Sequence, residues 1–91
     1  MAKPVITPTT RALVLARDRG CVLARYEPDH TCNGPLEIHH RKLRRHGDHS
    51  ADNLVTLFLV GHRWVHDHVA VSYAHGLLLR SGEFVAPLET P

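Results

Sequence analysis

A chain of 91 residues has room for one small domain, and a 43% hydrophobic content argues against global disorder. Its longest apolar run, residues 54–60, is far shorter than the roughly 18 residues that span a bilayer, and no signal peptide pattern opens the chain. We therefore expect a cytoplasmic protein with no membrane partner. Histidine usage is unusual: nine residues are His although the formal net charge is only +2. Histidine is a frequent metal ligand and proton carrier.

The first third of the chain predicts one helix between two irregular segments. Residues 1–8 contain two prolines and predict a flexible lead-in. Thr9 or Thr10 is expected to cap a helix that runs to about Arg19. Residues 21–35 hold both cysteines, two prolines and a glycine, and predict an irregular, tightly turned region.

The two cysteines, Cys21 and Cys32, leave three interpretations open. A disulfide is disfavoured inside a cell, and two thiols alone cannot close a four-ligand zinc site. A shared metal, a catalytic thiol and a plain buried cysteine remain. We favour the buried, non-catalytic role because free cysteine behaves as a small hydrophobe.

A ββα unit is predicted in the middle of the chain. Its first strand, polar loop, apolar second strand and helix are expected over residues 36–40, 44–52, 54–60 and about 62–73. The helix is expected to end near Gly76, with a small strand over 77–80 after it. This order predicts one α+β domain with an N-terminal helix. Lead-in, domain and C-terminal tail are expected over residues 1–8, 9–80 and 81–91.

Four histidines in this unit have the spacing of a metal site. His62 and His66 are four residues apart, so on a helix they share one face and can grip one ion. Neighbouring side chains alternate in a strand, so His39 and His40 cannot both bind that ion without distortion. One is expected to hold the metal while the other faces the substrate as a base. The remaining histidines are interpreted as surface or packing residues: His30, His46, His49, His68 and His75.

A concentrated basic run directly follows these strand histidines and consists of Arg41, Lys42, Arg44 and Arg45. Such a cluster indicates contact with a polyanion, with a merely solvated loop as the alternative. Arg63 is a candidate for clamping a phosphate oxygen. Trp64 is interpreted as a core anchor under the helix, with base stacking as the alternative.

Three segments together resemble the HNH endonuclease motif: Leu36-Glu37-Ile38-His39-His40-Arg41, Asn53-Leu54-Val55-Thr56-Leu57 and His62-Arg63-Trp64-Val65-His66. The chain is particularly similar to small HNH proteins of phages and actinobacteria, and its active-site order to bacteriocin-type HNH nucleases. The resemblance implies a ββα-metal core over about 36–73 and hydrolysis of phosphodiester bonds in DNA, by nicking or double-strand cutting with low sequence specificity. It further suggests a role in phage DNA packaging, with terminase or packaging proteins as partners and the host cytoplasm as location.

The resemblance also implies a role for each motif residue. The catalytic residues would be His40 as general base, Asn53 to orient it or bind metal, and Glu37 to hold active-site groups. One divalent cation would be ligated by His39, His62 and His66, and would act as a Lewis acid while His40 takes the proton of a water. Imidazole ligands suit zinc, nickel, cobalt or manganese, whereas magnesium prefers oxygen, so the identity of the metal stays open among these.

One departure from the family pattern concerns a second metal. Many members bind a structural zinc through two Cys-x-x-Cys pairs, but the second pair's positions here are Phe58 and Gly61. We therefore expect no structural zinc. Within enzymes the rivals are a nuclease toxin and a restriction-type nuclease. Outside enzymes they are a non-catalytic metal-stabilised DNA-binding module and a phage assembly adaptor whose histidines hold metal only for folding.

Overall fold

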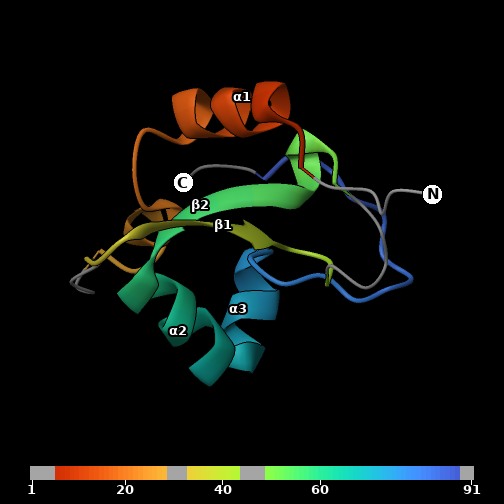
Figure 1. Cartoon of the computed structure of the whole chain (residues 1–91). Helices are drawn as coiled ribbons and strands as arrows, with labels where there is room; N and C mark the ends of the chain where they lie inside the picture. Colours follow the sequence, from red (N-terminus) through yellow and green to blue (C-terminus); the bar gives the residue numbers. More distant parts are fainter. Residues whose placement is uncertain (1–5, 29–32, 44–48, 89–91) are drawn as a thin grey trace.

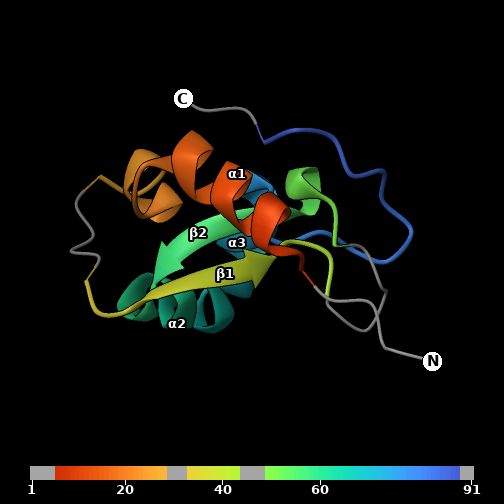
Figure 2. The same ribbon diagram turned by 45° about the horizontal axis from the view of Figure 1, so that its top comes forward.

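The computed structural model of the protein describes residues 6–28, 33–43 and 49–88. In these ranges three α-helices and a two-stranded antiparallel sheet form three layers (Figure 1). Helix α1 (Pro8–Asp18) covers one face of the sheet, and α2 (Leu59–Asp67) and α3 (Val69–His75) lie on the other. In the turned view α1 lies over β2 (Figure 2). The protein is a small α+β domain, as the sequence predicts.

The sheet pairs β1 (Leu36–His40) with β2 (Leu54–Phe58). The bounds of β1 are those predicted, whereas β2 ends two residues early because Leu59 and Val60 already belong to α2. Their N–H groups donate to the carbonyls of Pro35 (2.8 Å) and Asn33 (3.0 Å). The chain that enters β1 therefore caps the first turn of α2, which fixes this helix against the strand.

Helix α1 begins one turn earlier than predicted. The hydroxyl of Thr7, rather than Thr9 or Thr10, accepts from the Thr10 N–H at 3.1 Å. Pro8 follows as the first helical residue, where its missing N–H costs nothing. The last turn buries Asp18, whose carboxylate accepts the Thr56 N–H of β2 at 2.8 Å. This contact ties α1 to the sheet.

The single helix predicted over about 62–73 is two helices. His68 separates α2 from α3 with φ −123° and ψ 61°, outside the helical region. The Ser72 hydroxyl donates to the Val65 carbonyl at 3.1 Å and holds α3 against α2. Helix α3 ends at the predicted stop, Gly76, where φ is +80°. The break turns the chain back so that Leu77 is buried beside β1.

The segment after α3 differs from the prediction of a small strand and a tail. The strand is reduced to a single parallel bridge between Lys42 and Leu79. The described part of residues 81–91 is attached to the domain, because Leu88 packs against the core. Residues 89–91 lie outside the described chain.

Within the described ranges the irregular segments contain two short 3₁₀ helices, η1 (Val22–Arg25) and η3 (Ala51–Asn53). The core lies between η1, β2 and the two helices behind the sheet, and its buried residues are Val22, Leu23, Val55, Leu57, Val65, Leu77 and Leu78. Trp64 packs against this cluster, in agreement with its interpretation as a core anchor. No helix in the described ranges has the length and apolar character needed to cross a membrane.

Cys21 packs against the same core, but it is disulfide-bonded, which corrects the expectation of a free thiol. A disulfide sulfur is neither a thiolate ligand nor a nucleophile, so the metal-binding and catalytic roles for Cys21 are removed with it. Cys32 lies outside the described residues. Disulfides are rare in the cytosol, so this bond does not support the expected cytoplasmic location, which stays a prediction.

Candidate metal centre

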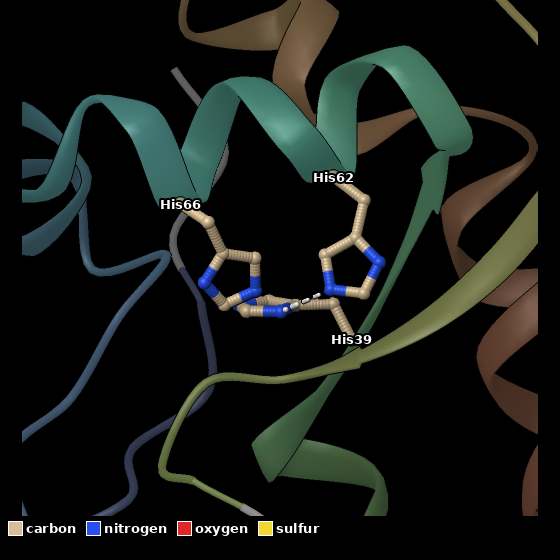
Figure 3. Close-up of side chains that lie close together, drawn as sticks. All are labelled: His39, His62 and His66. Atoms are coloured by element: carbon tan, nitrogen blue, oxygen red, sulfur yellow. Dashed lines mark hydrogen bonds between the residues drawn. The ribbon is translucent and has the colours of Figure 1, made fainter.

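Three histidines from β1 and α2 point toward one another between the sheet and the helix (Figure 3). His39 comes from β1, and His62 and His66 stand one turn apart on α2. One ring nitrogen of each lies within 4.8 Å of the other two, and His39 Nδ1 is 3.1 Å from His62 Nε2. Two imidazole nitrogens on one zinc ion lie roughly 3.3 Å apart. The described side chains therefore fit one shared cation, as the sequence predicts.

Two further contacts set which ring nitrogens face this centre. His39 Nε2–H donates to the Leu77 carbonyl at 2.7 Å, and His62 Nδ1–H donates to the Glu37 carboxylate at 2.8 Å. In these tautomers the lone pairs of His39 Nδ1 and His62 Nε2 face each other at 3.1 Å. Two facing acceptors repel unless a cation lies between them. Donor contacts of this kind behind the ring are typical of metal-bound histidine.

Burial favours the neutral form of His39 and His66. Desolvation, with a smaller contribution from the neighbouring histidines, lowers the pKa of His39 from 6.5 to about 3, although its bond to Leu77 acts in the opposite direction. Desolvation and the nearby His62 also lower the pKa of His66, the most exposed of the three. A metal ion binds the neutral imidazole, so near neutral pH it displaces no proton from His39.

His40 lies on the opposite face of β1 from His39, but both line one open hollow. Its volume is about 170 Å³, and its lining residues are Ile38, His39, His40, Leu43, His62 and His66. The ring of His40 is half-buried, and its Nε2 lies 3.1 Å from His49 Nδ1. Strand alternation thus gives the two histidines different surroundings, as predicted, while the hollow brings them to one place.

His49 is the site residue that the sequence interpretation missed, because it was grouped with the surface histidines. Its ring meets that of His40 edge-on, with centroids 5.2 Å apart. The available signal is the register, since His40 pairs with Leu54 at the start of β2 and the chain just before β2 must therefore pass the end of β1. Of the other surface or packing histidines, His68 and His75 fit that interpretation, and His30 and His46 lie outside the described residues.

Asn53 is fully buried and acts on the backbone that follows His40. Its side-chain oxygen accepts the Lys42 N–H at 2.7 Å, and its side-chain N–H donates to the Lys42 carbonyl at 3.0 Å. Its own carbonyl accepts the Arg41 N–H at 2.8 Å. These bonds lock the exit of β1 onto the entry of β2. They support an orienting role for Asn53 through the backbone beside His40.

Arg41 is the member of the basic run whose predicted phosphate contact the structure contradicts. Arg41 is only 4% exposed, and its guanidinium donates to the carbonyls of Gly76, Asp52 and Ala86 at 2.6–2.8 Å. Desolvation lowers its pKa. A group enclosed in this way holds the C-terminal segment and cannot reach a phosphate.

The other side chains predicted to bind phosphate differ in their contacts and exposure. Lys42 Nζ donates to the Glu83 carbonyl at 2.6 Å, so it too contacts the C-terminal segment. Arg63 is exposed on α2, beside His62, and agrees in position with a phosphate contact. Arg44 and Arg45 lie outside the described residues.

Comparisons of the chain with protein-family models, with curated proteins and with solved structures find no match. The interpretation of the site therefore rests on the geometry above and on the motif.

Proposed function

We propose that this chain is a metal-dependent endonuclease of the HNH type that hydrolyses phosphodiester bonds in DNA. The observation that carries the proposal is that the three-histidine group and His40 line one hollow. Phosphodiester hydrolysis needs charge neutralisation at the phosphate and a base for the attacking water. A ligand group and a separate histidine in one open hollow supply both requirements.

Each described residue then has a task. His39, His62 and His66 would hold a divalent cation, which would supply Lewis acidity at the phosphate. The Leu77 carbonyl and the Glu37 carboxylate hold the rings of His39 and His62 with their lone pairs turned inward. His40 takes the proton of the attacking water at a ring nitrogen, and Asn53 fixes the backbone beside it. The exposed Arg63 is placed to contact a neighbouring phosphate.

Two further parts of the proposal concern sequence specificity and partners. The open hollow supports contacts to the DNA backbone, and with them low sequence specificity. Association with phage packaging proteins rests on the resemblance of the motif alone.

A plasmid-nicking assay tests the proposal. Supercoiled DNA is incubated with the protein and zinc, nickel, cobalt, manganese or magnesium, with EDTA as the control. We expect at least one ion to support conversion to nicked or linear DNA, and EDTA to abolish it. A parallel RNA substrate defines the preferred nucleic acid. Metal-dependent DNA binding without any cutting would overturn the enzyme proposal in favour of a non-catalytic metal-stabilised binding module.

A further inference from the structure

An exposed phenylalanine lies beyond the hollow described above. Phe84 is 87% exposed, the largest value among the large hydrophobic side chains of the described chain. Exposed leucines and valines are common on small proteins, but an aromatic ring so far out of the core presents nearly its whole surface to solvent.

The backbone that carries Phe84 is held on both sides of this residue. Lys42 Nζ donates to the Glu83 carbonyl at 2.6 Å, and the Arg41 guanidinium donates to the Ala86 carbonyl at 2.6 Å. Both donors come directly after His40 on the chain. The cations expected to bind phosphate therefore fasten the segment 83–86 to the end of β1. Phe84 is presented from an anchored segment.

Phe84 also lines an open hollow of about 500 Å³. The lining also includes Ser50, the neighbour of His49, and Asp52, the neighbour of Asn53. Lys42 belongs to the same lining and directly precedes Leu43, which lines the His40 hollow. The Phe84 hollow thus shares its flanking chain segments with the proposed catalytic hollow.

We propose that Phe84 is a stacking platform for an unpaired nucleobase of the substrate strand, next to the position of cleavage. The inference rests on the proposed function and names a subsite of that substrate. The volume falls within the range of small-ligand sites, roughly 300–1,000 Å³. Aromatic faces stack on any base.

Binding of short single strands tests this subsite. A fluorescently labelled oligothymidylate and an abasic strand of equal length and charge are titrated against metal-loaded protein in a His40→Ala background, which prevents cutting. Phe84→Ala is expected to weaken binding of the oligothymidylate roughly 5- to 150-fold, the value of one stacked base. Binding of the abasic strand is expected to be unchanged, with the same salt dependence, because no phosphate contact is removed.

Three further variants separate stacking from other effects. Phe84→Trp is expected to keep the affinity, and Phe84→Leu to lose it as Phe84→Ala does, because leucine is apolar but has no ring face. Leu13→Ala, which removes an exposed hydrophobic side chain from α1, is the matched control and is expected to change nothing.

Each remaining outcome has one meaning. Equal affinity of Phe84→Ala and its parent, or an equal loss on the abasic strand, overturns the subsite. A dimer that dissociates in Phe84→Ala by size-exclusion chromatography also overturns it and assigns the ring to a contact between copies. Phe84-dependent strand binding by a protein that cuts no nucleic acid supports the subsite and contradicts the nuclease proposal alone.

Discussion

Two adjacent histidines at the end of β1 lie in opposite surroundings. His39 is 2% exposed, and its Nε2–H donates to the Leu77 carbonyl. Burial lowers the pKa of His39 to about 3. The ring of His40 is half-buried and faces His49 and an open hollow. Because side chains alternate along a strand, one peptide unit is enough to place one imidazole in the core and the next at the surface.

The difference suits two kinds of chemistry. A metal ligand must stay neutral and keep a fixed orientation, which burial and a carbonyl acceptor provide. A general base must reach water and keep a pKa near the working pH, which requires partial exposure. The fold therefore separates the two tasks by the direction of the side chain. Variants that change either the metal-binding side or the His40 side of β1 test this separation.

The largest expected effect is that of His62→Ala. Removing this ligand takes away the imidazole that faces His39 at 3.1 Å, so we expect metal binding and cleavage both to be lost. The metal-induced rise in Tm is expected to disappear as well, because stabilisation by a ligand depends on its affinity. Isothermal titration calorimetry, thermal unfolding and the nicking assay measure these changes. His68→Ala, on the same chain segment but outside the group, is the control, and an unchanged metal response in His62→Ala would remove His62 from the ligand set.

Next in size is the effect of His40→Ala. We expect cleavage to fall by about 10²- to 10⁴-fold, the range for loss of a general base, while metal affinity stays near that of the parent protein. The paired variant His39→Ala is expected to lose both. If calorimetry finds that His40→Ala binds metal as poorly as His39→Ala, the two histidines do not divide the work as proposed.

Local periodicity predicted part of the ligand group, namely His62, His66 and one of His39 and His40, whereas the choice of His39 came from the resemblance to the HNH motif. Alternation over Leu36–His40 and the four-residue spacing of His62 and His66 depend only on strand and helix geometry, and both are confirmed. The break at His68 was not predicted, because no glycine or proline marks it. That break has a consequence for the site, since it returns the chain so that the Leu77 carbonyl meets His39.

Long-range contacts explain what the sequence interpretation missed. Arg41 has the same local signature as a phosphate-binding arginine, a cation in a basic run. Its burial depends on three carbonyls, of Asp52, Gly76 and Ala86, that come from separate segments. Likewise His49 meets His40 only because the loop closes onto the end of β1. Neither set of contacts can be predicted from the local sequence pattern.

A smaller effect is expected from the carboxylate behind His62. Glu37→Ala removes the acceptor of the His62 Nδ1–H, which frees the ring to rotate and to change tautomer. We expect metal affinity to fall about 10- to 100-fold, as is usual for such supporting groups. Glu37→Gln keeps an acceptor without the charge and should lie between the two. The measurement is competition with a chelating dye, and an Ala variant that binds metal like its parent would make the Glu37 contact incidental.

The smallest effect concerns the metal-free protein and pH. In the unfolded chain His39 takes up a proton as the pH falls through 6.5, but in the folded chain it does so only near pH 3. Between these values the unfolded state binds more protons. The stability present above pH 6.5 is therefore lost progressively as the pH falls toward 3, with a slope of at most about 1.4 kcal/mol per pH unit for one proton. Urea unfolding in EDTA over a pH series measures the free energy of unfolding.

The variant His39→Asn isolates this contribution, because position 39 no longer titrates while the rest of the sequence is unchanged. We expect the parent to lose more free energy of unfolding than His39→Asn between pH 7 and 5, whatever their absolute stabilities. Bound metal should oppose the loss, since it holds the histidines in the neutral form. Parallel pH curves for the two metal-free proteins would mean that the His39 ring is protonated in the folded protein as readily as in water. The claim that burial distinguishes His39 from His40 would then be wrong.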